Sequence, residues 1–340
     1  MKPLTKYLSQ ATLALSLLAL TASCDTDVEA LDIAEPGIEQ QNPELYQQYL
    51  ADLRQYKQSA HRVAIGWLDN SEKLPQSQGQ QIHAVPDSLD YVVLTSVDVL
   101  TTRELAQIEQ LRTEKGTRVV YEISFEAIQN AYDALAAEEG AVLPAFADFL
   151  VDSVQTRLAL CERYGLDGVV MAYNGKEKMY QDDDARTELI ARENDFIGMA
   201  RDWAERHTDR QLLLMGKPQN ISDQTVFSLA SYIILPCQSE TSASALTYVA
   251  TKAAADGVPA TKLVPLVTTT SLDAADTKTG YWGDHDSAIL GAARWAASSH
   301  EGFTPAGIAI DEMGRDYYNP TFTYPNVRTA ISIINPTAKQ

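Results

Sequence analysis

Hydrophobic and polar positions alternate along the chain as short apolar runs separated by longer amphipathic stretches. Eight runs of six or seven residues are rich in apolar and β-branched side chains and are bounded by polar residues or glycine. Such runs are typical of buried strands. The predicted strands are residues 62–68, 90–96, 118–124, 168–173, 211–216, 231–236, 263–268 and 306–311.

The stretches between these runs have apolar residues at helical spacing. Residues 105–111 are one example, and Gly116 follows as a helix stop. Strands that alternate uniformly with helices predict an α/β fold with a parallel sheet, and eight units fit a closed (β/α)8 TIM-type barrel. The alternative is an open doubly wound sheet, which is less favoured because no glycine-rich phosphate turn follows the first strand. We expect one domain over residues 43–340, beginning with a helix at 43–58.

The N-terminus has the pattern of a targeting segment. Lys2 and Lys6 precede an apolar stretch that is too short to span a membrane, and small residues then lead to Cys24. This pattern resembles a bacterial lipobox, which implies a signal peptide over residues 1–23 and a lipid on Cys24. The alternative is an ordinary secretory signal with an incidental cysteine. Residues 24–42 are acidic and predict a linker.

The acidic start after Cys24 resembles the surface-export signal of Bacteroidetes lipoproteins. It implies an anchor in the bacterial outer membrane, facing outward, with the lipid as the only membrane contact. The alternative is a solvated tether. Removing the signal leaves roughly 320 residues, a length that suits one α/β barrel.

The chain is strongly acidic, with a formal net charge of −19. Nucleic acids and anionic lipid surfaces would repel it, so neither is an expected partner. No metal-ligand spacing or cofactor motif occurs, so we expect no metal and no cofactor. Cys161 and Cys237 are more simply explained as two buried small residues than as a disulfide.

The fourth predicted strand carries the most specific signal. Asp167-Gly168 opens a stretch that resembles D-G-x-D-x-D-x-E, the signature strand of glycoside hydrolase family 18. Val170 and Ala172 stand where the family has aspartates, and Asn174 stands where it has the catalytic glutamate. Residues 49–67, which include Leu53-Arg54 and end in Gly66-Trp67, also resemble a Bacteroidetes endo-β-N-acetylglucosaminidase-like subgroup of this family.

The resemblance implies a substrate-assisted hydrolysis that this sequence is not equipped to perform. In the family a glutamate protonates the glycosidic oxygen, and an aspartate orients the 2-acetamido group of the sugar. Asn174 is an amide and cannot serve as that acid, Ala172 has no polar atom, and Val170 removes the neighbouring charge. No catalytic residue is therefore expected at these three positions.

The alternative to an inactive site is that another carboxylate takes the place of the lost acid. By position at predicted strand ends or nearby, the candidates are Glu122, Glu177, Asp311 and Glu312. A solvated or ion-paired carboxylate is the simpler interpretation of each. Asp182-Asp183-Asp184 is better interpreted as the start of a helix than as a cation site.

Amides, hydroxyls and aromatic rings at the predicted strand ends suit sugar binding. The ligand-binding candidates are Trp67, Tyr173, Asn174, Gln238, Tyr281, Trp282, Asp311 and Tyr317. Core packing is the alternative for each aromatic residue. Three hypotheses follow: a surface lipoprotein that binds N-acetylglucosamine-containing glycan beside an outer-membrane glycan importer, an active hydrolase with a relocated acid, and a structural partner of such an importer.

Overall fold

The computed structural model describes residues 41–283, 286–319 and 322–336 of the 340 in the chain. Contacts divide the chain into two compact units, residues 1–48 and 49–340. Helix α3 (Pro43–Gln58) begins in the first unit and ends in the second, and it confirms the helix predicted at 43–58. The predicted signal peptide, Cys24 and nearly all of the predicted linker lie outside the described residues.

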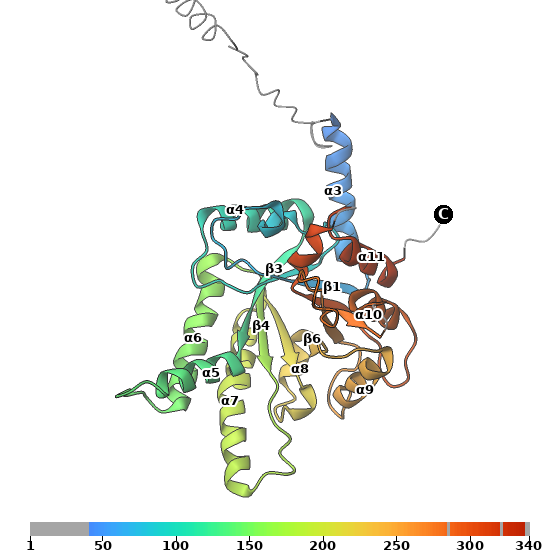
Figure 1. Cartoon of the computed structure of the whole chain (residues 1–340). Coiled ribbons are helices and arrows are strands. Elements are labelled where there is room, and N and C mark those ends of the chain that lie inside the picture. Colours follow the sequence, from blue (N-terminus) through green and yellow to red (C-terminus); the bar gives the residue numbers. More distant parts are fainter. Residues whose placement is uncertain (1–40, 284–285, 320–321, 337–340) are drawn as a thin grey trace, which may run out of the picture. The chain divides into compact units, whose positions relative to one another are not determined.

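The second unit contains a closed barrel of eight parallel strands, labelled in part in Figure 1. Around the barrel the strands follow the order β1-β10-β7-β6-β5-β4-β3-β2. The predicted (β/α)8 barrel is confirmed, and the open-sheet alternative is wrong. The strands are β1 (Val63–Leu68), β2 (Tyr91–Leu94), β3 (Arg118–Ser124), β4 (Gly168–Tyr173), β5 (Gln211–Gly216), β6 (Ala230–Pro236), β7 (Leu263–Thr268) and β10 (Gly307–Asp311).

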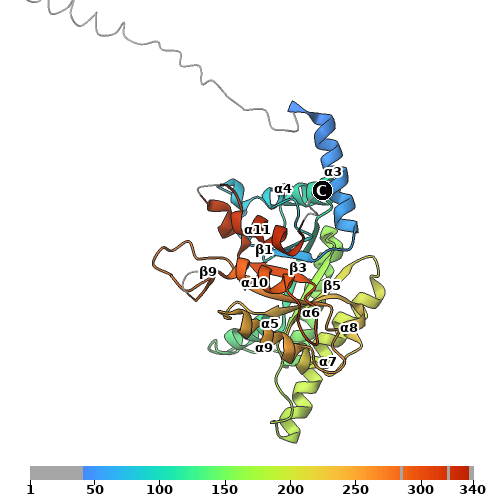
Figure 2. The same cartoon turned by 90° about the vertical axis from the view of Figure 1, so that its right-hand side faces the viewer.

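Helices lie around the outside of the barrel in both views (Figures 1 and 2). They are α4 (Thr102–Gln110), α5 (Phe125–Ala136), α6 (Phe146–Tyr164), α7 (Asp183–Arg206), α8 (Val226–Leu229), α9 (Ala243–Ala253), α10 (Ala288–Ala297) and α11 (Pro325–Ile334). Local sequence sets their limits. Asp182 caps α7 by accepting the amide of Ala185, as the acidic run predicted, and Gly116 is left-handed (φ 67°) after the turn that extends α4.

The core has two layers, and this division decides which strand residues reach the inside of the barrel. The inner cluster includes Val93, Val120, Val170 and Leu213, and the outer cluster fills the space between strands and helices. Because side chains alternate along a strand, neighbours in sequence belong to different layers. Gly168 begins β4 where a Cβ atom would lie 2.0 Å from the carbonyl oxygen of Gln211, so only glycine fits there.

A second, two-stranded sheet lies in the segment after β7. It pairs β8 (Tyr281–Trp282) with β9 (Asp286–Ser287) in the antiparallel direction. Short 3₁₀ helices also follow several strands, among them η4 (Pro218–Asn220) and η5 (Met313–Tyr318). These additions all follow the carboxyl ends of barrel strands, the end at which function is expected in this architecture.

Candidate functional site

Strand β4 carries the positions at which the acids of the signature are replaced. Val170 belongs to the inner cluster, whereas Met171 belongs to the outer cluster. Ala172 is buried two residues after Val170, and Asn174 follows the strand end partly exposed. Since alternate residues share a face, the inward side of β4 offers an isopropyl group and a methyl group, and the amide of Asn174 follows the strand. The strand contributes no carboxylate to the barrel mouth.

The main chain at Asn174 is held from two sides. Its N–H donates to Oε1 of Glu126 at 2.9 Å, and its carbonyl accepts a hydrogen bond of 2.9 Å from Nδ2 of Asn220. Glu126 lies in the first turn of α5, and Asn220 lies in η4 after β5. The end of β4 is therefore fixed between its two neighbouring connections.

A second carboxylate beside these positions comes from β3. Glu122 is the register partner of Val170, and its Oε2 accepts a hydrogen bond of 3.0 Å from Nε1 of Trp67. Burial raises the pKa of Glu122, and the negative charges of Asp311 and Glu126 raise it further, against the hydrogen bond from Trp67. This carboxyl group therefore retains a proton at a higher pH than an exposed glutamate does.

Two predicted ligand-binding residues meet across the mouth. Nε2 of Gln238, after β6, donates to Oδ2 of Asp311, at the end of β10, at 3.2 Å. The charge of Asp311 also acts on Glu122. The structure thus brings Trp67, Glu122, Asp311 and Gln238 into one polar group. The other two candidate acids are ion-paired: Glu177 with Lys252 at 3.7 Å, and Glu312 with Arg315 at 3.3 Å.

The prediction that Tyr173 binds ligand at the mouth is wrong. Tyr173 is an outer-layer residue, and its ring packs between Phe125 and Phe196 with centroid distances of 5.2 and 6.1 Å. Its position between the inward residues Ala172 and Asn174 sends it to the other face of the strand. Trp67 points inward but is only 4% exposed, so its ring is part of the inner core and offers an edge rather than a free face.

The prediction for Trp282 is also wrong, because the pair Tyr281-Trp282 is not an exposed aromatic platform. Trp282 is buried against α10, and a Cβ atom at Gly291 would lie 2.3 Å from its ring. Tyr281 is half-buried beside it. Tyr317 packs on Gly79 and has its ring centroid 5.4 Å from that of Tyr324, which favours a packing role.

A hollow that the sequence did not reveal lies at the carboxyl ends of β4, β5 and β6. Its volume is about 630 Å³, and its lining comes from segments 175–181, 216–220, 235–240 and 248–253. We call it the carboxyl-end hollow. Tyr180 and Tyr248 line it with exposed fractions of 79% and 64%. Neither tyrosine ends a strand, so listing strand-end residues could not find them.

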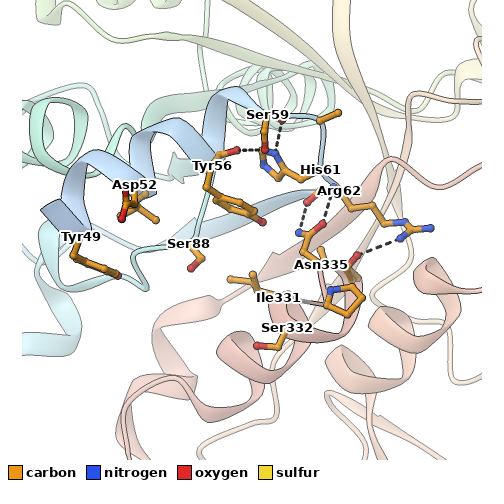
Figure 3. A pocket seen from close by; sticks show the side chains of 14 residues that line it. Tyr49, Asp52, Tyr56, Ser59, His61, Arg62, Ser88, Ile331, Ser332 and Asn335 are labelled. Atoms are coloured by element: carbon orange, nitrogen blue, oxygen red, sulfur yellow. Dashed lines mark hydrogen bonds between the residues drawn. The ribbon is translucent and has the colours of Figure 1, made fainter. Parts of the chain in front are cut away.

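A second hollow lies at the opposite end of the barrel and has a volume of about 770 Å³. It is lined by segments 49–62 and 331–336 with Ser88 (Figure 3), and we call it the amino-end hollow. Nε2 of His61 lies 2.9 Å from Oδ1 of Asp90, and this contact raises the pKa of His61. Polar groups at the amino ends of barrel strands usually serve stability rather than function.

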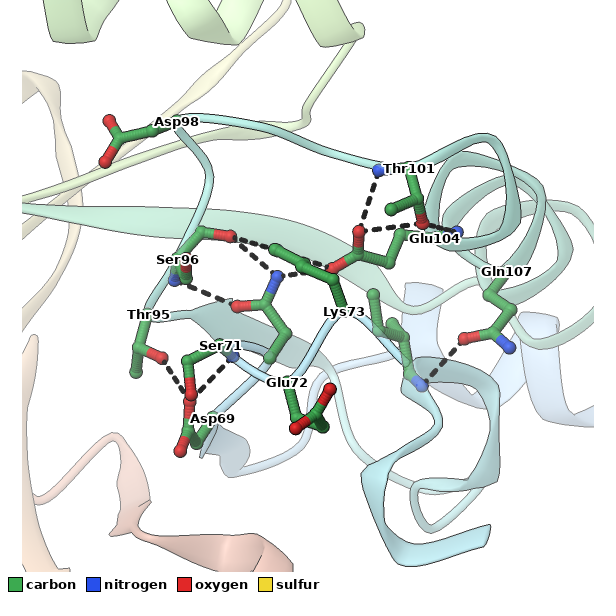
Figure 4. Close-up of polar contacts among 12 residues, drawn as sticks. Asp69, Ser71, Glu72, Lys73, Thr95, Ser96, Asp98, Thr101, Glu104 and Gln107 are labelled. Carbon is green, nitrogen blue, oxygen red and sulfur yellow. Dashed lines mark hydrogen bonds and ion pairs between the residues drawn. The ribbon is translucent and has the colours of Figure 1, made fainter. Parts of the chain in front are cut away.

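A buried polar network joins the segment after β1 to α4 (Figure 4). Nδ2 of Asn70 donates to the carbonyl of Ser96 at 2.7 Å and to Oε1 of Glu104 at 2.8 Å. Lys73 pairs with the same oxygen at 2.8 Å. Although burial acts to raise it, the pKa of Glu104 is lowered by the hydrogen bonds from Lys73, Thr101 and Asn70. Every member has a partner, so the network fixes the first connection of the barrel.

Three kinds of feature were sought among the described residues: a metal site, a disulfide and a membrane-spanning helix. Among the described residues, no cluster of histidine, cysteine or carboxylate side chains has the arrangement of a metal site. Cys161 and Cys237 are both free and buried, as predicted. No described helix combines the length and apolar character needed to cross a membrane.

Comparisons with known proteins agree with this architecture. The family described as "Glycoside hydrolase family 18, BT1044-like" matches residues 26–333. A selenomethionine form of BT1044 with one glutamate replaced by glutamine has a TM-score of 0.63 at 19% identity, over 88% of this chain and 95% of that one.

An endo-β-N-acetylglucosaminidase from Cordyceps militaris is similar, with a TM-score of 0.62 at 15% identity, over 85% of this chain and 96% of that one. A double mutant of the same enzyme, in complex with fucosyl-N-acetylglucosamine-Asn, has a TM-score of 0.60 at 15% identity, over 84% and 95% of the two chains. The chain matches none of the curated proteins with which it was compared.

Proposed function

Because the chain belongs to glycoside hydrolase family 18, in its BT1044-like group, we propose that it binds glycan without cleaving it. The observation that carries this proposal is that β4 and the residue after it have Val170, Ala172 and Asn174 in place of carboxylates, with Val170 inside the barrel. An amide does not ionise near neutral pH and cannot act as a general acid, a role that typically contributes about 10²- to 10⁴-fold to the rate. Loss of the acid and of the orienting aspartate together removes most of the expected catalysis.

Glycans that contain N-acetylglucosamine are the ligands we propose. A similar barrel from Cordyceps militaris is in complex with fucosyl-N-acetylglucosamine-Asn, and the mouth of this barrel retains groups that suit sugar hydroxyls. Asn174 is partly exposed there, and Gln238 and Asp311 lie within hydrogen-bonding distance of each other. Amides bind hydroxyls as donors and as acceptors, and ionised carboxylates accept hydrogen bonds from them.

We also propose that the protein is a lipoprotein on the outer face of the outer membrane, anchored through Cys24. The lipobox-like residues before Cys24 and the acidic residues after it support this location. A glycan-binding protein at that surface would hold oligosaccharide for import, next to the importer components.

The test is to incubate the purified mature protein with N-glycoproteins and chito-oligosaccharides and to measure both binding and released sugar. We expect binding without product. The triple change Val170→Asp/Ala172→Asp/Asn174→Glu restores the three carboxyl groups of the signature, and we expect it to produce weak hydrolysis. Release of product by the unaltered protein would contradict the proposal.

One observation favours a second function, hydrolysis with a relocated acid. Glu122 has a raised pKa, lies beside Val170 and lines a cavity of about 270 Å³. If the unaltered protein releases product, Glu122→Gln should abolish it, while Glu312→Gln serves as the control because Glu312 is paired with Arg315. Activity that survives Glu122→Gln would exclude this second function.

A further inference from the structure

We propose that the carboxyl-end hollow is a subsite for acidic sugars, in which lysine side chains bind a carboxylate or a sulfate group. The proposal rests on the proposed glycan-binding function and adds a class of ligand to it. Three features of the hollow carry it: its free lysines, its exposed tyrosines and the contacts that hold its wall in place.

The lysines are the first feature. Lys176 and Lys217 are exposed and line the hollow, and their side chains have no hydrogen-bond or ion-pair partner among the described residues. Lys252 also lines it but is paired with Glu177 at 3.7 Å. Glu240 is the remaining carboxylate in the lining. The hollow therefore carries a local excess of positive charge.

This excess stands out against the rest of the molecule. The chain has a formal net charge of −19, with 46 acidic residues against 27 basic ones. Most described lysines are engaged in ion pairs or hydrogen bonds; Lys57, Lys73, Lys115, Lys178 and Lys262 are examples. A general acidic surface repels anions, so an anionic ligand would be concentrated only where cations are grouped.

The tyrosines are the second feature and indicate a sugar rather than a free anion. Tyr180 and Tyr248 line the same hollow and are largely exposed. Aromatic rings pack on the apolar faces of pyranose rings, and large exposed aromatic residues in a concave site mark ligand sites more often than random surface. The Nζ atom of Lys252 lies 5.5 Å from the centroid of the Tyr248 ring, which restricts the orientation of that ring.

The third feature is the wall that carries Lys176 and Tyr180, the segment from Asn174 to Asp182. Lys178 in this segment pairs at 2.5 Å with Glu193, a carboxylate of α7 that is fully buried, and it also donates to the carbonyl of Asn220. The guanidinium of Arg186 donates to the carbonyl of Gln181 at 3.0 Å. A wall held by these contacts presents its lysine and tyrosine in a fixed arrangement, which lowers the entropic cost of binding.

The experiment compares three matched glycans on the full mature protein by calorimetry. They are a biantennary N-glycan with terminal sialic acids, the same glycan after removal of sialic acid, and the desialylated glycan sulfated on N-acetylglucosamine. We expect at least one acidic form to bind about five- to tenfold more tightly than the neutral form at about 50 mM salt, because two exposed ion pairs supply about that much. We expect the preference to fall at high salt.

Two variants test whether the preference for acidic glycans arises in this hollow. Lys176→Gln/Lys217→Gln should remove it and leave the affinity for the neutral glycan unchanged. Lys278→Gln is the matched control, since Lys278 is another exposed lysine whose side chain has no hydrogen-bond or ion-pair partner among the described residues and does not line the hollow. The thermal midpoint of each variant confirms that it is folded.

The possible outcomes separate this proposal from the one on which it rests. Equal binding of neutral and acidic glycans, or a preference that survives the double change, overturns the acidic subsite and leaves glycan binding intact. Binding of none of the three glycans overturns both. A preference for the sialylated form alone assigns the site to carboxylates, and a preference for the sulfated form alone assigns it to sulfates.

Discussion

The two hollows at opposite ends of the barrel differ in what their polar groups contact. The amino-end hollow is the larger, about 770 against 630 Å³. Three of its polar residues are nevertheless engaged: His61 with Asp90, the guanidinium of Arg62 with the carbonyl of Ile334 at 3.2 Å, and Asn335 with the main chain of Arg62. The hollow is lined by groups that hold the first strand to the last helix.

The carboxyl-end hollow is smaller, but two of its cations have no partner among the described residues, and two of its aromatic rings are exposed. Polar groups that already have partners gain little from a ligand, whereas unpaired ones gain a hydrogen bond or an ion pair. The difference teaches that free chemical groups, rather than volume, make the carboxyl-end hollow the better candidate for a ligand site.

The largest expected effect is a loss of stability on removing the buried ion pair that holds the wall of the carboxyl-end hollow. Glu193→Ala leaves Lys178 without its buried partner, and breaking such a pair costs about 3–5 kcal/mol in the free energy of unfolding. Urea denaturation measures the loss. Glu188→Ala is the control on the same helix, because it removes an exposed pair with Arg192 that contributes about 1 kcal/mol or less. Similar losses in the two variants would show that the buried pair does not hold the wall.

A smaller effect is expected from the aromatic lining. Tyr248→Ala removes an exposed ring from the carboxyl-end hollow, and we expect the dissociation constant for neutral and acidic glycans alike to rise about tenfold. Tyr49→Ala is the matched change at the amino-end hollow, where the hydroxyl donates to Asp87 at 2.8 Å. It should leave glycan affinity unchanged. Equal effects of the two changes would remove the distinction between the hollows.

Much of this architecture follows from sequence periodicity. All eight strands were predicted to within a few residues, because parallel barrel strands are buried on both sides and appear as apolar runs between polar ends. The same alternation explains Val170 and Ala172, whose inward direction follows from counting residues along β4. Gln238 and Asp311 were both chosen at strand ends and lie together for that reason.

The errors have a common physical cause, which is that exposure depends on tertiary packing. Tyr173 ends a strand but faces α5 and α7, and Trp282 follows a polar loop but packs on Gly291. Conversely, Tyr180 and Tyr248 lie in a connecting segment and on a helix, far apart in sequence, and only the fold brings them to one hollow. No local sequence pattern predicts that two such distant residues line the same hollow.

The smallest expected effect is a pH dependence at the amino-end hollow. The hydrogen bond with Asp90 raises the pKa of His61 above its ordinary value near 6.5, against the effect of burial. The folded state therefore holds the proton more tightly than the unfolded state. The resulting stability is fully present below the unfolded pKa and is lost as pH rises through the folded pKa.

Asp90→Asn removes the charge that holds this proton and keeps an oxygen for the amide of Ala64, which donates to Asp90 at 2.8 Å. We expect the free energy of unfolding of the unaltered protein to fall, relative to that of the variant, as the pH rises above about 6.5. The comparison needs the variant because burial lowers the pKa of His83, which gives a slope of the opposite sign.

Glycan affinity should follow neither slope, since the pair of His61 and Asp90 lies at the opposite end of the barrel from the proposed ligand. Parallel stability curves for the two proteins would show that His61 is not protonated preferentially in the folded state, and a matching change in glycan affinity would couple the two ends of the barrel.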